Sequence, residues 1–202
     1  MPKRVDHEER RSQIAEALIR VAAARGLHAV GLRDVAAEAG VSLRLVQYYF
    51  ETKEKLLLHG LQHLVDGFTA RVAAGISAAG TNPCPRAVIE ALLLAALPAD
   101  EESRAFHLLH TSYTLLAVTD PALAAQPPFT NARAAEDAVT ALLRKAVEAG
   151  QASPGTDPGA EAAALLAMSA GLGTSVLAGY RTTESAAAVL RHQLDRIFAT
   201  GD

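Results

Sequence analysis

The sequence predicts an all-α protein, and three observations support this fold class. Apolar residues recur at spacings of three and four along almost the whole chain, and no sustained run alternates with a period of two. Ala, Leu, Arg and Glu dominate the composition. The 202 residues are 50% hydrophobic and 20% charged, which is typical of a soluble globular chain with a sizeable core. We expect nine or ten helices, arranged as a small N-terminal three-helix domain and a larger C-terminal helical bundle.

The N-terminal part of the chain predicts three helices. Asp6 and Glu9 resemble a capping pair at the start of the first helix, and Gly26 supplies a left-handed stop. Ser42 is the expected N-cap of the third helix. The expected bounds of the three helices are Asp6 to Gly26, Leu32 to Gly40 and Ser42 to Phe50.

The rest of the chain predicts six or seven further helices, which glycine and proline separate. Asp120-Pro121 and Asp157-Pro158 each combine a capping residue with a proline at the first helical position, and Pro127-Pro128 predicts a loop. We place residues 1–55 in the first domain and residues 56–202 in the second. The expected helices run from Thr52 to Ile76, Ala87 to Leu97, Asp100 to about Leu116, from Asp120 for a short distance, Asn131 to Ala149, Asp157 to Gly179, and Thr182 or Thr183 to Ala199.

The cysteine content and the absence of apolar runs indicate the cellular compartment. The single cysteine, Cys84, excludes a disulfide framework and an all-thiolate metal cluster, and it stands between two prolines as an expected loop residue. The N-terminal residues carry charges where a signal peptide needs an apolar core, and no stretch approaches the roughly 18 unbroken apolar residues of a membrane span. We therefore expect a cytoplasmic protein without a membrane partner.

Basic residues are concentrated near the N-terminus, although the whole chain has a net charge of -3. Residues 1–55 contain ten of the 19 Lys and Arg residues and eight of the 22 Asp and Glu residues, whereas the remainder has a net charge of -5. A polyanion would therefore be expected to bind at the N-terminal end. Many solvated helices carry a similar excess, so the charge alone is weak evidence.

The third predicted helix separates two kinds of side chain. At about 100° per residue, Val46 and Phe50 face the core, whereas Arg44, Gln47 and Tyr48 share the opposite arc. A guanidinium, an amide and a phenol are groups that read guanine, read adenine and bind phosphate in a major groove. With the short helix before it, this helix predicts a helix-turn-helix. The alternative is a bundle corner whose exposed polar face has no role.

The segments AAEAGVS and VQYYFETKEKLL resemble the DNA-binding domain of the TetR family of bacterial transcriptional regulators. The resemblance covers about Glu9 to Leu58, and the rest of the chain is similar only in its layout of helices. The resemblance implies a DNA-binding domain followed by a regulatory and dimerisation domain. The positions it implies for DNA contact are Lys3, Arg4, Arg33, Ser42, Leu43, Arg44, Leu45, Gln47, Tyr48 and Lys53.

Some of these positions carry a competing interpretation or depart from the family pattern. Lys3 and Arg4 form either a basic arm that reaches phosphates or a disordered tail. Many family members have Thr where this chain has Gly31, so we expect the second helix to be more weakly capped. Arg44 and Gln47 also differ from many members, so no operator sequence transfers from a relative.

A homodimer on double-stranded DNA is expected, because one helix-turn-helix reads only a few base pairs. Specific recognition calls for two copies about 34–36 Å apart on a near-palindromic operator. The resemblance implies that the last two long helices form the dimer interface, and the alternative for each stripe on them is a core contact within the chain. The candidate residues are a small-residue stripe of Ala167, Gly171 and Ser175 and an apolar seam of Ala186, Leu190, Leu194, Ile197 and Phe198.

The resemblance also implies a small-molecule site between the long fourth helix and the sixth to eighth helices. For each candidate, an ordinary core position is the alternative. Few aromatics and only Asp66 as an interior acid argue against a broad cationic-drug pocket, so we expect an apolar or mildly polar effector. The candidate lining residues are Phe68, Phe106, Leu109, His110, Tyr113, Phe129, Met168 and Leu172.

Other functional classes find less support in the sequence. Two histidine pairs one turn apart, His59 with His63 and His107 with His110, would bind zinc only if they faced each other, so no metal and no cofactor are expected. No glycine-rich phosphate loop or nucleophile and base motif indicates an enzyme. The sequence predicts a ligand-controlled repressor, with activation as the opposite sign and a helical ligand carrier or adaptor that does not bind DNA as the alternative.

Overall fold

The computed structural model describes residues 2–27, 30–125 and 127–198. Across these residues the chain forms ten helical segments and no strand, which confirms the all-α fold class. The segments are α1 (Pro2–Arg25), α2 (Leu32–Glu38), α3 (Leu43–Phe50), α4 (Lys53–Ala78), α5 (Pro85–Ala95), α6 (Glu101–Thr119), α7 (Pro121–Ala124), α8 (Pro127–Glu148), α9 (Pro158–Leu177) and α10 (Thr183–Ile197).

Two predicted helix starts are wrong, and both lie beside prolines. Helix α1 begins at Pro2 rather than at the expected Asp6 and Glu9 pair. Helix α8 begins at Pro127, so the predicted Pro127-Pro128 loop belongs to its first turn. Proline lacks an N–H and has a fixed φ, and the first turn of a helix needs no N–H donor, so both prolines fit helix starts.

Several other predicted caps are confirmed. The Thr52 hydroxyl accepts a hydrogen bond from the Lys55 backbone N–H at 3.3 Å, and the Thr182 hydroxyl accepts one from Ser185 at 3.2 Å. Asp100 and Ser103 form a reciprocal capping box at the start of α6. Gly31 makes no side-chain cap to α2, as the comparison with threonine predicts. Most boundaries were therefore encoded locally.

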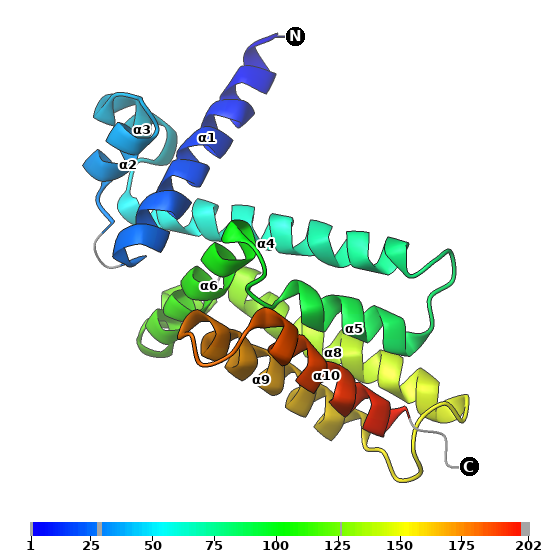
Figure 1. Cartoon of the computed structure of the whole chain (residues 1–202). Coiled ribbons are helices and arrows are strands. Elements are labelled where there is room, and N and C mark those ends of the chain that lie inside the picture. Colours follow the sequence, from blue (N-terminus) through cyan, green and yellow to red (C-terminus); the bar gives the residue numbers. More distant parts are fainter. Residues whose placement is uncertain (1, 28–29, 126, 199–202) are drawn as a thin grey trace.

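The helices pack around two hydrophobic cores. The first unites α1, α2, α3 and α4 with α6, and the second unites α5, α8, α9 and α10. Figure 1 shows α1 to α3 gathered at one end of α4, while the rest of α4 runs alongside α5. Leu56 and Leu64 of α4 belong to the first core, so that core extends past the boundary predicted at residue 55.

Helices α1 and α4 approach closely at Gly60. A Cβ atom at this position would lie 2.3 Å from Cδ2 of Leu18, which is far inside van der Waals contact. Leu18 and Gly60 are both buried. The absence of a side chain at Gly60 thus lets Leu18 pack directly on the α4 backbone and joins the N-terminal helices to α4.

Candidate DNA-binding surface and effector site

Helix α3 presents its polar side chains outward, as the sequence predicts. The Ser42 hydroxyl accepts a hydrogen bond from the Leu45 backbone N–H at 3.2 Å and caps the helix. Val46 is fully buried, while Arg44 and Gln47 are exposed and Tyr48 is 70% exposed. One face of α3 therefore combines a guanidinium, an amide and a phenol that face solvent.

The remaining predicted DNA contacts lie on or beside this helix in different degrees of exposure. Ser42 and Arg33 are exposed, and Leu43, Leu45 and Lys53 are half-buried. Lys53 is the first residue of α4, where it follows the α3 to α4 turn. Lys3 and Arg4 belong to α1, and their side chains lie outside the described residues.

Helix α1 holds the helix-turn-helix in place through polar contacts that the sequence analysis missed. The Gln13 side-chain amide donates to the Ala39 carbonyl at 3.2 Å, beside the turn between α2 and α3. Arg20 pairs with Glu38 at 2.8 Å. Arg25 pairs with Asp34 at 3.1 Å. The partners come from different helices, so no i,i+4 pattern reveals them.

Aromatic contacts fix the inner side of α3. The Tyr49 hydroxyl lies 3.0 Å from His7 Nδ1 on α1. The Arg11 guanidinium carbon lies 5.2 Å from the centre of the buried Phe50 ring, and His59 of α4 approaches the same ring at 5.2 Å. Burial, with a further contribution from Arg11, lowers the pKa of His59. These contacts orient α3 against α1 and α4.

The turn from α3 to α4 contains a strained residue. Glu51 has φ 58° and ψ -57°, which a residue with a Cβ atom rarely adopts. Its carboxylate pairs with the Lys55 ammonium at 2.6 Å, and this hydrogen bond lowers the pKa of Glu51. The strained turn sets the direction in which α4 leaves α3.

The predicted effector residues separate into two groups. Phe106, Leu109 and Tyr113 are buried in the first core, where Phe68 packs against them. Leu172 is buried in the second core, and Met168 packs against that core. The side chain of Phe129 lies outside the described residues. The core alternative therefore fits most of these residues, and only the group on α4 and α6 forms one continuous cluster.

Aromatic rings stack within the α4 and α6 group. The Phe68 and Phe106 rings are parallel, with an interplanar angle of 1° and centres 4.9 Å apart. The His110 ring stacks on Phe106 at 5.5 Å, and burial lowers the pKa of His110. Burial also raises the pKa of Tyr113. An aromatic stack thus spans the interface between the two helices.

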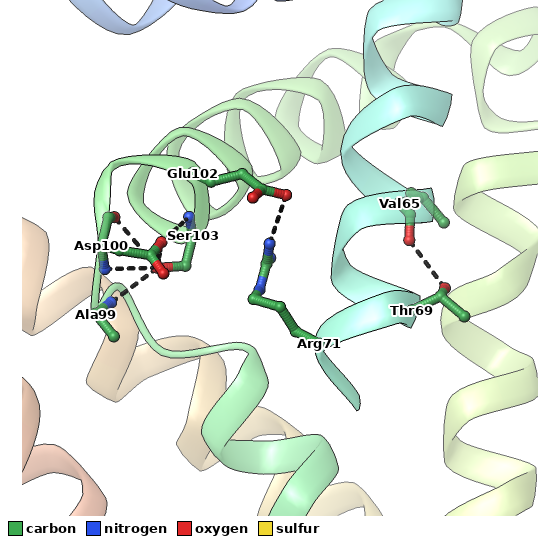
Figure 2. Close-up of polar contacts among 7 residues, drawn as sticks. All are labelled: Val65, Thr69, Arg71, Ala99, Asp100, Glu102 and Ser103. Carbon is green, nitrogen blue, oxygen red and sulfur yellow. Dashed lines mark hydrogen bonds and ion pairs between the residues drawn. The ribbon is translucent and has the colours of Figure 1, made fainter. Parts of the chain in front are cut away.

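Arg71 stands at the edge of this stack, and the sequence analysis missed it. Figure 2 shows its side chain extending from α4 toward Glu102 at the start of α6. Its Nη1 lies 2.8 Å from Glu102 Oε1, and its guanidinium carbon lies 5.9 Å from the centre of the Phe106 ring. Arg71 follows Phe68 by three residues, and this spacing places both side chains on one face of α4. The same spacing could have identified Arg71 as a candidate from the sequence.

Two nitrogens of Arg71 have no acceptor within the part of the chain that the structure describes. Nε and Nη2 are buried and make no hydrogen bond with any residue that the structure describes. Leaving a buried donor without a partner costs about 1–3 kcal/mol, and more when the group is charged. Such groups in native proteins call for an explanation, and a ligand acceptor is one.

Two cavities formed by described residues lie elsewhere, one between α1, α4 and α6 and the other between α1, α6 and α9. One has a volume of about 440 Å³ and is lined by residues that include Arg20, His63 and Glu102. The other, of about 380 Å³, is lined by residues that include Arg104 and Leu177. Neither is lined by a predicted effector residue. Both lie where the N-terminal helices meet α6.

The histidine pairs do not combine into a metal site within the described ranges. No group of three or more His, Cys, Asp or Glu side chains there is arranged to hold a metal ion. His107 is buried and its Nε2 lies 3.2 Å from the Thr174 hydroxyl of α9. A Cβ atom at residue 173 would lie 2.2 Å from His107 Cε1, so Gly173 gives the ring its space. His107 therefore contacts α9 rather than a second pair of histidines.

The two candidate dimer stripes differ in exposure. On α9, Ala167 and Gly171 are exposed and Ser175 is half-buried. The apolar seam on α10 packs against the second core of its own chain, as the alternative to a dimer interface predicts. In this seam Ala186, Leu190 and Leu194 are fully buried, Ile197 is 3% exposed and Phe198 packs against the same core.

Helix α9 is also the one helix, among the residues described, with the length and composition of a membrane span. Its mean hydropathy over 18 residues is 1.4, and 28% of that window is buried. Core helices of soluble proteins have the same properties. The exposed residues of α9 include Ala167, Gly171 and Thr174.

Comparisons with known proteins agree with this architecture. The family model described as bacterial regulatory proteins, tetR family, matches residues 14–59, and the model described as BetI-type transcriptional repressor, C-terminal, matches residues 85–199. The HTH-type transcriptional regulator PksA of Bacillus subtilis is 37% identical over 103 residues, which are 51% of this chain and 49% of PksA. The chain spans about half the length of the first curated relatives it matches.

Solved structures resemble the whole chain. A putative TetR-family transcriptional regulator from Rhodococcus sp. is 26% identical, with a TM-score of 0.77, over 95% of this chain and 100% of the other. A putative transcriptional regulator from Saccharomonospora viridis in complex with choline has a TM-score of 0.79 at 22% identity, over 93% of this chain and 96% of the other. These relatives are regulators rather than enzymes. Together with the two family models, they show that the chain belongs to the tetR family of bacterial regulatory proteins.

Proposed function

We propose that this protein is a ligand-responsive, DNA-binding transcriptional repressor. The observation that carries the proposal is the outward face of α3, on which Arg44, Gln47 and Tyr48 lie together above a buried inner face. These three groups recognise base edges and phosphates in a major groove. A helical carrier or adaptor would have no use for such a face.

The roles of the DNA-contacting residues follow from their chemistry and position. Arg44 and Gln47 are the base-reading residues of the proposal, because guanidinium and amide groups pair with guanine and adenine. Arg33 and Lys53 are its phosphate contacts, at the start of α2 and α4. Polar contacts from α1 keep these helices in one orientation, so the face enters the groove as a rigid unit.

The working unit of this proposal is a homodimer on a palindromic operator in the cytoplasm. The exposed side of α9, with Ala167 and Gly171, is the surface that we assign to a second copy, because small residues let helices approach closely. Two copies would place their α3 helices about 34–36 Å apart on successive turns of the duplex.

The proposed effector acts through α4. Helix α4 contacts the N-terminal helices at Gly60 and carries Phe68 and Arg71 farther along the same helix. An effector that separates α4 from α6 would change the angle of α4 and move the two recognition helices out of register. A full switch from 99:1 to 1:99 requires the effector to prefer the released form by about 5.5 kcal/mol.

Fluorescence anisotropy with DNA from beside the protein's own gene tests the proposal. We expect binding at least about a thousandfold tighter to a palindrome within that DNA than to a scrambled duplex of equal length at physiological salt. The affinity for both should fall as salt rises. Equal micromolar binding to both duplexes would contradict the proposal and favour the carrier or adaptor.

A further inference from the structure

We propose that Arg71 binds the carboxylate of the effector, and that the effector is therefore a monocarboxylate with an apolar body. This inference rests on the proposed function, because it assumes that an effector enters between α4 and α6. It differs from the case of the structural neighbour from Saccharomonospora viridis, whose ligand, choline, is a cation.

The free edge of the Arg71 guanidinium has the geometry of a carboxylate site. Nη1 is engaged by Glu102 on the exposed side of α6. The Nε–H and one Nη2–H point in parallel from the opposite edge of the planar group, and both nitrogens are buried without an acceptor among the described side chains and carbonyls. Two parallel N–H donors match the two oxygens of one carboxylate.

The surroundings of that edge suit an apolar body. Phe106, whose ring lies beside the Arg71 guanidinium, stacks with Phe68 and with His110. Leu109 follows on the same helix and is buried in the same core. A short aliphatic chain attached to the carboxylate would therefore contact rings and methyl groups rather than further charges.

The same arrangement disfavours a cationic effector. Quaternary ammonium ligands bind to the faces of aromatic rings. The Arg71 guanidinium already lies 5.9 Å from the centre of the Phe106 ring, so an ammonium at this stack would meet a like charge. An alkylammonium ligand without a hydroxyl group would also leave the Nε and Nη2 donors without an acceptor.

Isothermal titration calorimetry with three probes of equal chain length tests the inference. The probes are octanoate, 1-octanol and octyltrimethylammonium, added to the full-length protein without DNA. We expect octanoate to bind at least about tenfold more tightly than either of the other two. Tighter binding of octyltrimethylammonium, or equal binding of all three, would overturn the inference.

Two variants locate the binding at Arg71. Arg71→Met should weaken octanoate binding by at least about tenfold, whereas Arg144→Met, which removes an exposed arginine of α8, should leave it unchanged. If circular dichroism shows that Arg71→Met does not fold, octanoate binding by Glu102→Gln tests the role of Arg71 instead. This substitution removes the negative charge that competes for the guanidinium and should therefore tighten octanoate binding, whereas a purely structural ion pair predicts no gain.

The outcome separates this inference from the proposed function. Octanoate binding that depends on Arg71, in a protein that does not bind its neighbouring DNA specifically, would contradict only the repressor proposal. Specific DNA binding without octanoate binding would overturn only the carboxylate assignment. Specific DNA binding that octanoate releases in the unchanged chain, but not in Arg71→Met, would support both.

Discussion

At the scale of single residues, the exposed face of α3 makes a specific prediction about DNA recognition. Arg44→Ala should cost about 1–3 kcal/mol on the operator and relax specificity at one base pair, because it removes a base-edge contact. Lys53→Ala should instead weaken binding to all sequences alike and reduce the salt slope by about 0.9, because it removes one phosphate contact. Anisotropy on a set of single-base operator variants, at several salt concentrations, distinguishes the two effects.

Arg144→Ala is the matched control for both variants. It removes an exposed positive charge from α8, far along the chain from the recognition helix, and should leave operator binding as it is. Equal losses on operator and scrambled DNA for Arg44→Ala would refute its base-reading role.

The exposure of the proposed DNA-contacting residues was more predictable from the sequence than the contacts of the proposed effector residues. Arg44, Gln47 and Tyr48 share an arc that periodicity alone defines, and Ser42 marks where their helix begins. Arg71 became a candidate only through its contacts with Glu102, which lies 31 residues later on another helix, and with the Phe106 ring. Sequence spacing contains no information on such a contact until the packing of α4 against α6 is known.

At the scale of elements, the α3 to α4 turn predicts an unusual gain in stability. Glu51→Gly should raise the midpoint of thermal unfolding by about 2–4 °C, because glycine adopts a positive φ without the strain of a Cβ atom. This gain should exceed the loss of the exposed Lys55 pair and of the chain stiffness that glycine removes. Calorimetry on the two proteins measures the shift.

Glu54→Gly is the control for this turn. Glu54 lies in the first turn of α4 with ordinary helical geometry, where glycine lowers helix stability and removes a favourable charge at the helix N-terminus. We expect its midpoint to fall. A midpoint that falls equally in Glu51→Gly would show that the strain at residue 51 does not limit stability.

Helix ends were predictable wherever a side chain caps them, and less so elsewhere. Thr52, Asp100 and Thr182 each accept a hydrogen bond from the first turn, so their residue types predicted their positions. The starts at Pro2 and Pro127 were missed, because a proline is compatible both with a loop and with a first helical turn. The choice between them depends on packing that no local signal expresses.

At the scale of the whole molecule, the two cores explain how the N-terminal helices are linked mechanically to the helices of the second core. Helix α6 packs against α1 and α4 through the first core and contacts α9 through His107. The predicted division at residue 55 does not coincide with a boundary between the two cores, since α1, α2 and α3 share their core with α4 and α6. We therefore expect a movement of α4 relative to α6 to change the packing of α1.

One buried histidine and two half-buried ones predict how the free energy of unfolding of the whole molecule depends on pH. Burial lowers the pKa of His59, His107 and His110 below the ordinary value of 6.5, so the unfolded chain binds more protons than the folded chain in mildly acidic solution. The free energy of unfolding should therefore fall as the pH is lowered from about 7.5 to about 5. Asp100, whose pKa is lowered from 3.8 chiefly by the Ser103 backbone N–H, contributes only in more acidic solution.

His107 is the histidine whose role can be isolated most clearly. The Thr174 hydroxyl donates to the Ala170 carbonyl at 3.0 Å and lies 3.2 Å from His107 Nε2. Burial lowers the pKa of His107, although the Ala96 carbonyl acts in the opposite direction. His107→Gln keeps a donor for Thr174 but cannot take up a proton, and urea unfolding should show a flatter pH profile, by at most about 1.4 kcal/mol per pH unit. His192→Gln, which removes an exposed ring from α10, should keep the original profile. An unchanged profile in His107→Gln would mean that protonation at the α6 to α9 contact does not govern acid stability, because His59 and His110 would then account for all of it.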